Sequence, residues 1–154
     1  MNISSSAITP AFRPLAQLVL AMPMARTLGL SFTRIAPGEV ELEIPLLDTF
    51  CFRPGQLQAT AVFAAADFAA VAAAGTTLPP GWSNATVDAT LKLVAPARGT
   101  KLRARGRVVS AARLLTVCAA EVYAVSPAGE ETLCATLLGT ARNIDHNAAA
   151  PSMA

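Results

Sequence analysis

The chain has 154 residues, a length typical of one domain with a substantial core. Its net charge of +2 and its 5% of aromatic residues exclude a protein that neutralises many phosphates and stacks bases, so no nucleic acid is expected as a partner. Hydrophobic residues make up 53% of the chain and charged residues 14%, which indicates that part of the surface is covered by a second copy of the chain.

The first third of the chain predicts a flexible end, a helix and a hairpin. Residues 1–10 are small and polar and are expected to be flexible. Residues 12–22 have the composition of a short helix that ends at Pro23. Residues 28–35 are rich in apolar residues, and in residues 39–44 glutamates alternate with apolar residues. These two segments are therefore expected to form a β-hairpin with one solvent-exposed face.

A long apolar helix is predicted next. Every residue from Gln56 to Ala74 is compatible with helix, and Gly75 is expected to end it. The helix is apolar nearly all round, which is typical of buried helices. Asp67 is its only charged residue. Desolvating a carboxylate costs several kcal/mol and raises its pKa, so Asp67 is a candidate functional acid, unless it lies on an exposed strip or is satisfied by a backbone amide.

Four strands with alternating apolar and polar residues are predicted in the second half, at 85–93, 101–108, 114–125 and 132–144. The face expected to be buried in the first of them comprises Ala85, Val87, Ala89, Leu91 and Leu93. The second strand carries four cations on one face, namely Lys101, Arg103, Arg105 and Arg107. This row is either a site for a phosphorylated ligand or a solvated outer face.

The order helix, two strands, long helix, four strands predicts the fold class. It is an α+β fold in which a curled antiparallel β-sheet of about six strands wraps around a long central helix. We expect one domain at residues 11–144, with flexible segments at 1–10 and 145–154.

Several other classes of function lack the residues they need. The three cysteines are widely spaced and form no C-x-x-C pair, so no disulfide framework, no metal site and no cofactor are expected. Residues 15–22 are too short for a signal peptide, and residues 59–74 are shorter than the roughly 20 residues of a membrane span. A cytoplasmic protein without membrane contact is therefore predicted. The single histidine, His146, lies in the polar tail and is no well-placed base for a catalytic triad.

A set of short motifs resembles a known family across residues 28–143. Its members are hotdog-fold thioesterases of the phenylacetate-pathway (PaaI-like) type, in which a small-residue helix begins at Gly-x-x-His-Gly-Gly and carries Leu-Ala-Asp a few residues later. The matching segments in order are Gly55-Gln56-Leu57-Gln58-Ala59-Thr60, Ala65-Ala66-Asp67, Thr86-Val87-Asp88, Leu93-Val94-Ala95-Pro96 with Gly99, and Gly139-Thr140. The resemblance implies a hotdog fold.

The resemblance also implies a site and a reaction. It suggests an acyl-CoA or related thioester as substrate and Asp67 as general base or nucleophile. Ala59 or Thr60 would supply the N–H that polarises the thioester carbonyl, since helix N-terminal amides carry partial positive charge. Gln58 stands where the family has histidine, and it can orient a substrate but cannot shuttle a proton. Because the family's sites need two chains, a homodimer or homotetramer is expected, with the site at a subunit interface.

Substrate contacts are expected from aromatic and basic residues near the helix start. These are Phe50, Phe52, Arg53 and Phe63, with Arg53 a candidate for the CoA phosphates. The alternative is a hotdog protein that binds an acyl-CoA or fatty acyl chain without cleaving it. A hydratase on the same fold would want a His/Asp pair that the sequence does not offer near the helix.

Overall fold

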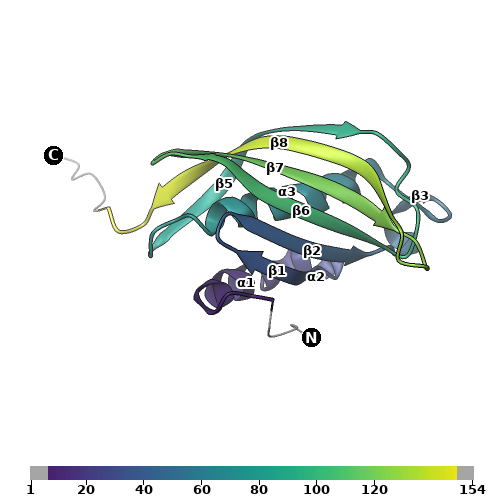
Figure 1. The fold of residues 1–154 in the computed structure, drawn as a ribbon, viewed down its shortest axis with the longest axis horizontal. Coiled ribbons are helices and arrows are strands. Elements are labelled where there is room, and N and C mark those ends of the chain that lie inside the picture. The colour runs from purple at the N-terminus through teal and green to yellow at the C-terminus, as the bar shows by residue number, and fades with distance from the viewer. Residues whose placement is uncertain (1–6, 149–154) are drawn as a thin grey trace.

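The computed structural model describes residues 7–148 (Figure 1). In the first part of the chain the elements are η1 (Pro10–Phe12), α1 (Arg13–Leu20), α2 (Pro23–Leu28), β1 (Ser31–Ala36), β2 (Glu39–Pro45), η2 (Asp48–Phe50), β3 (Cys51–Arg53) and β4 (Gln56–Leu57). They are followed by α3 (Ala59–Gly75), β5 (Trp82–Leu93), β6 (Lys101–Ala111), β7 (Leu115–Val125) and β8 (Glu131–Asp145).

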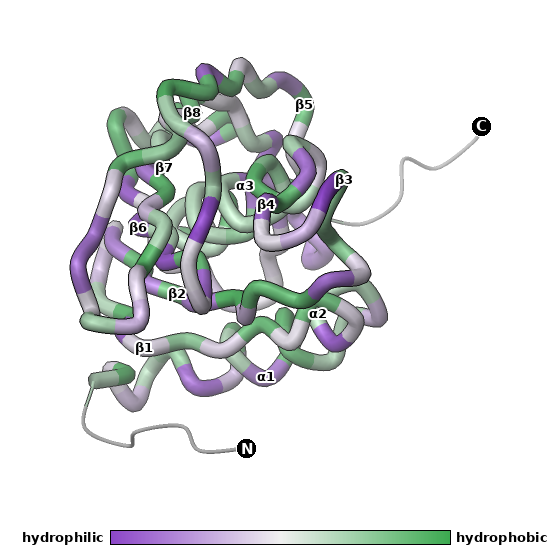
Figure 2. Tube along the Cα trace, turned by 90° about the vertical axis from the view of Figure 1, so that its right-hand side faces the viewer, coloured by the Kyte–Doolittle hydropathy of each residue, from purple (hydrophilic) through white to green (hydrophobic). Residues whose placement is uncertain are grey.

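One antiparallel sheet of six strands, in the order β1-β2-β6-β7-β8-β5, curls around α3. Figure 2 shows α3 inside the arc of strands, and α3 contacts five of them, β2, β5, β6, β7 and β8. The predicted α+β hotdog architecture is confirmed. The strands β3 and β4 form a separate small hairpin just before the helix.

Small residues bring the helix close to the sheet. The buried residues of α3 are all alanine or valine, and β6 has Gly106 where it crosses the helix. A Cβ atom built on Gly106 would lie 2.0 Å from the carbonyl oxygen of Ala69. Only glycine therefore allows this approach, which fixes the height of α3 beneath the sheet.

The boundaries of the long helix differ from the prediction. The helix begins at Ala59, because Gln56 and Leu57 pair with β3 across a tight turn. Gly75 is the last helical residue and does not end the helix through a left-handed conformation. The C-cap residue is Thr76, whose hydroxyl donates to the Ala73 carbonyl at 2.6 Å and accepts from the Gly38 amide at 2.8 Å. The hairpin turn thus holds the helix end.

The N-terminal region also departs from the prediction. Pro23 does not end the first helix but begins α2, since proline is favoured in the first helical turn after an extended residue. Residues 7–9 pack on β1, with Ile8 buried and bridged in parallel to Ile35, so this part of the expected flexible end is held by the sheet, whereas Pro10 is exposed. Residues 1–6 and 149–154, also expected to be flexible, lie outside the described residues.

Candidate active site

Asp67 lies in the middle of α3, half-buried, on the wall of a pocket of about 410 Å³. The pocket is formed by α1, α3 and the first part of β5. The hydroxyl of Thr86 on β5 donates a hydrogen bond of 2.8 Å to Asp67 Oδ1. No ion pair to Asp67 occurs within residues 7–148. Asp67 is therefore partly buried, its hydrogen-bond donor is a hydroxyl on another element and not a backbone amide, and its role as a functional acid stays a prediction.

The surroundings make this carboxyl group more basic than usual. Burial raises the pKa of Asp67, and the hydrogen bond from Thr86 opposes part of that rise. The interior next to it is apolar enough that burial, aided by the charge of Asp67, raises the pKa of Cys118 to about 11. A carboxylate with one hydrogen bond and no cationic partner keeps its second oxygen available to a water molecule.

A β-bulge in β5 places Thr86 against Asp67. Val87 has no partner on β8, and the register shifts between Thr86 and Asp88. Consequently Asn84 and Thr86 face α3 before the bulge, with Asn84 Nδ2 donating to the Val71 carbonyl at 3.0 Å. The prediction that Ala85 and Val87 face the core is therefore wrong for the first half of the strand, where Val87 is 57% exposed. Bulges often re-aim a side chain next to a site in this way.

The other pocket walls are apolar and come largely from α1 and α3. They include Leu15, Leu18 and Met22 of the N-terminal helical region and Phe68 and Val71 of α3. Leu18 and Met22 remain 59% and 40% exposed. Sequence reasoning assigned no role to this first helix. Its apolar residues at 15, 18, 19 and 22 follow helical spacing, and this pattern is the feature of the sequence that predicts an apolar face on the helix.

Gln58, Ala59 and Thr60 form the start of α3 and are all exposed. Gln58 is the N-cap residue, with φ −68° and ψ 148°, and the first amides of a helix have no acceptor within the helix. Ala59 and Thr60 are thus suited to bind a developing negative charge. Asp67 follows Gln58 by nine positions, which is about 13 Å along the helix at 1.5 Å per residue. One chain therefore does not bring the acid and the helix start to the same reacting atom.

The aromatic and basic residues expected to bind substrate gather near the helix start and not in the Asp67 pocket of their own chain. Phe50 packs against the core, whereas Phe52 is 57% and Phe63 37% exposed. Arg53 lies over the Phe52 ring, with 5.2 Å between its guanidinium carbon and the ring centroid. Their roles in binding stay predictions.

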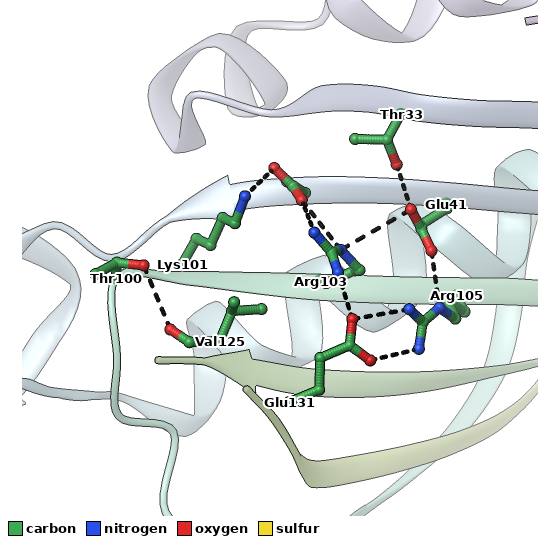
Figure 3. A network of polar contacts seen from close by, with 9 residues as sticks. Thr33, Glu41, Thr100, Lys101, Arg103, Arg105, Val125 and Glu131 are labelled. Carbon is green, nitrogen blue, oxygen red and sulfur yellow. Dashed lines mark hydrogen bonds and ion pairs between the residues drawn. The ribbon is translucent and has the colours of Figure 1, made fainter. Parts of the chain in front are cut away.

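The predicted row of cations lies on the outer face of the sheet and is paired with carboxylates (Figure 3). Lys101 pairs with Glu43, Arg103 with Glu43, Glu41 and Glu131, and Arg105 with Glu41 and Glu131. The sheet register causes this, because the glutamates of β2 stand opposite the arginines of β6. Three of the four cations are already neutralised, which favours the outer-face alternative over a phosphate site.

His146 is closer to the site than the sequence indicated. Its Nε2 atom lies 2.7 Å from the hydroxyl of Ser83, which lines the Asp67 pocket. The histidine forms no hydrogen bond to Asp67 in the described part of the chain. Within residues 7–148 no three histidine, cysteine or carboxylate side chains gather to hold a metal ion.

Solved structures resemble this arrangement closely, although no family model and no curated protein matches the sequence. A thioesterase family protein from Silicibacter pomeroyi has 30% sequence identity and a TM-score of 0.81, with 84% of this chain and 94% of that one covered. This chain belongs to the hotdog-fold thioesterase superfamily and is PaaI-like. A phenylacetic acid degradation-related protein from Ralstonia eutropha JMP134 has 26% identity, a TM-score of 0.72, and coverage of 85% and 98%.

The PaaI protein of E. coli has the same fold, with a TM-score of 0.75 at 16% identity over 88% of this chain and 94% of its own. In this PaaI-like chain β5 is an edge strand with one unpaired side. Val87 and Leu93 of this strand, and Val94 directly after it, are apolar and between 54% and 57% exposed. Such an edge is a natural place for a second copy to pair. No helix in the described residues has the length and apolarity to cross a membrane.

Proposed function

We propose that this thioesterase-family protein hydrolyses acyl-CoA thioesters at a site shared by two subunits. Asp67 of one chain acts as general base or nucleophile, and the Ala59 or Thr60 N–H of the other binds the thioester oxygen. The observation that carries the proposal is a half-buried, hydrogen-bonded acid with a raised pKa on the wall of an apolar pocket. The expected homodimer or homotetramer and the cytoplasmic location remain part of this proposal.

The chemistry follows from the acid in the middle of α3 of one chain and the start of α3 of the other. As general base, Asp67 takes a proton from water while the water oxygen attacks the thioester carbonyl. The carbonyl oxygen becomes negative and is stabilised by the helix-start amides, which point along the helix dipole. The C–S bond then breaks, and the proton goes from Asp67 to the departing thiolate. Gln58 would orient the substrate by hydrogen bonding, since its amide does not exchange protons.

The pocket supports an acyl group as the part of the substrate held near Asp67. Leu15, Leu18 and Phe68 give it apolar walls, and about 410 Å³ is the size of a small-ligand pocket. Burying an acyl chain there is favourable by about 0.8 kcal/mol per CH₂ group. A panel of acyl-CoA esters of increasing chain length, followed by thiol release, tests the activity directly.

Binding without cleavage is the second candidate function. It is favoured by the exposed Gln58, whose side chain makes no capping hydrogen bond and replaces the family's histidine. A binding protein would be stabilised against heat by an acyl-CoA through mass action but would release no thiol. Thiol release from any ester of the panel decides for the enzyme.

Removing the hydroxyl of Thr86 is expected to shift the pH profile of hydrolysis. The Thr86 hydrogen bond lowers the pKa of Asp67, so Thr86→Val raises it further. Because the base must be ionised, the acid limb of kcat/KM should move to higher pH. Below the pKa of Asp67, kcat/KM should be about fivefold lower in Thr86→Val, the effect of one hydrogen bond of about 1 kcal/mol on ionisation, and the two proteins should converge at high pH.

The matched control is Thr86→Ser, which keeps the hydroxyl and should retain the wild-type limb. A purely structural role of Thr86 would lower kcat/KM equally at every pH. Coincident acid limbs for the wild type and Thr86→Val would therefore contradict this positioning role.

A further inference from the structure

Two arginines from distant parts of the chain converge on one neutral oxygen beside the start of α3. Gln56 Oε1 accepts from Arg53 Nε and Nη2 at 3.0 and 2.7 Å, and from Arg98 Nε and Nη2 at 3.3 and 3.0 Å. Arg98 lies in the loop after β5, and this loop is tied to β4 by the Leu57 amide, which donates to the Ala97 carbonyl at 3.1 Å. The pair is thus a built feature of this end of the fold.

The charge of this pair is not balanced within residues 7–148. Neither Arg53 nor Arg98 forms an ion pair there, whereas Arg103 and Arg105 are each shared between carboxylates. Two guanidinium groups held on one uncharged acceptor repel each other and still have free N–H donors. An anion with several oxygens would relieve the repulsion and accept hydrogen bonds from both, and a phosphate group has this geometry.

An aromatic ring completes the surface. Phe52 is 57% exposed, and Arg53 lies on only one of its faces. A free aromatic face beside a cationic pair is suited to stack a nucleobase, with the phosphates on the arginines. Gln56, which holds the pair, also lies two residues before Gln58, next to the helix start at which the thioester carbonyl is proposed to bind.

We propose that Arg53 and Arg98, held by Gln56, bind the phosphates of the nucleotide end of a CoA thioester, with adenine on Phe52. This inference rests on the proposed function for the identity of the carrier. It adds Arg98, a residue that no sequence motif marked, and it makes the phosphorylated carrier, not only the acyl chain, a determinant of specificity.

Calorimetric titration with adenosine 3′,5′-bisphosphate tests the pair without any turnover. The wild type should bind the nucleotide, and Arg53→Gln and Arg98→Gln should each weaken binding about tenfold or more, the loss expected for a charge-assisted contact. The matched control is Arg34→Gln, which removes an arginine from β1 that pairs with Glu39. It should change the affinity less than about twofold, because Arg34 lies beside the turn that contacts the far end of α3 and takes no part in the Arg53–Arg98 pair.

Hydrolysis separates this inference from the proposed function. With one acyl group on two carriers, Arg98→Gln should lower kcat/KM for acyl-CoA about tenfold and leave kcat/KM for acyl-pantetheine, which has no phosphate, unchanged. Nucleotide binding that depends on both arginines, without cleavage of either ester, would support the pair and contradict the hydrolase. Absence of nucleotide binding by the wild type, or wild-type affinity in the two arginine variants, would overturn the inference.

Discussion

Asp67→Asn is expected to lower kcat/KM for an acyl-CoA ester by a factor of about 10² to 10⁴, the usual contribution of a positioned general base. Asparagine has the same shape and can still accept the hydrogen bond from Thr86, but it cannot take a proton from water. The pocket and the substrate contacts should remain, so KM should change much less than kcat.

The same substitution is expected to preserve or raise stability. Burial raises the pKa of Asp67 in the folded chain above its value in the unfolded chain. As pH rises, Asp67 therefore ionises at a lower pH in the unfolded chain than in the folded chain. The resulting decrease in the free energy of unfolding is complete once the pH exceeds the pKa of Asp67 in the folded chain. The introduced asparagine carries no charge, so at pH of about 8 the variant should melt no lower than the wild type, whereas at pH of about 3 the two should converge.

Thiol-release assays and thermal melts on the same samples check both expectations. Equal activity of the two proteins would exclude Asp67 as the base or nucleophile. A variant that loses activity together with several degrees of melting temperature would show that the acid is structural.

Val87→Lys is expected to convert the protein to monomers and to remove its activity. Val87 is the unpaired residue of the bulge on the free edge strand β5, and its apolar side chain is 57% exposed in the single chain. A second copy paired along β5 would cover this edge. A lysine buried there would cost several kcal/mol, and one that faces its symmetry mate would add like-charge repulsion. Because one chain keeps Asp67 and the helix start about 13 Å apart, a monomer should lose at least about a hundredfold in kcat/KM.

The chain offers a closely matched control in Val109→Lys. Val109 is the residue skipped in a bulge of β6, between Val108 and Ser110, and is 49% exposed. Its strand lies between β2 and β7 and is not an edge strand of the sheet, although residues 108–111 extend beyond the last pair with β2, Glu39–Arg107. Sedimentation and thiol release should match the wild type for Val109→Lys and fall together for Val87→Lys. A dimeric and active Val87→Lys protein would show that β5 is not the interface.

The central helix and the alternating strands can be predicted from the sequence because each depends on local periodicity. A helix with alanines on all sides is predicted to be buried, and a single acid such as Asp67 stands out from that pattern. The β5 bulge is not visible in this way. Residues 85–93 alternate without a break, so the change of phase at Val87 depends on pairing with β8 and α3. The role of Thr86 therefore required the fold.

Two other features depend on tertiary contact alone. The sequence around Gln56 predicts helix. In the structure, however, a tight turn precedes Gln56, so that it pairs with β3 and its side chain accepts hydrogen bonds from Arg53 and Arg98. Arg98 is 45 residues from Arg53 in the sequence, and no motif links them. The row of cations on β6 was ambiguous for the same reason, since its neutralisation depends on the register with β2.

Subunit complementation tests the shared site most directly. Ala59→Pro removes one of the two candidate N–H groups at the helix start, and proline fits there because Ala59 is the first helical residue and Gln58 is extended. With the Ala59 N–H as the donor, Ala59→Pro and Asp67→Asn should each be inactive alone, whereas an active Ala59→Pro protein would assign the donor to Thr60. In a mixed dimer one of the two sites combines the intact acid of one chain with the intact helix start of the other. Random 1:1 reassociation should therefore restore about a quarter of the wild-type activity, by two-fold symmetry. A mixture as inactive as its two components would contradict a site built from two chains.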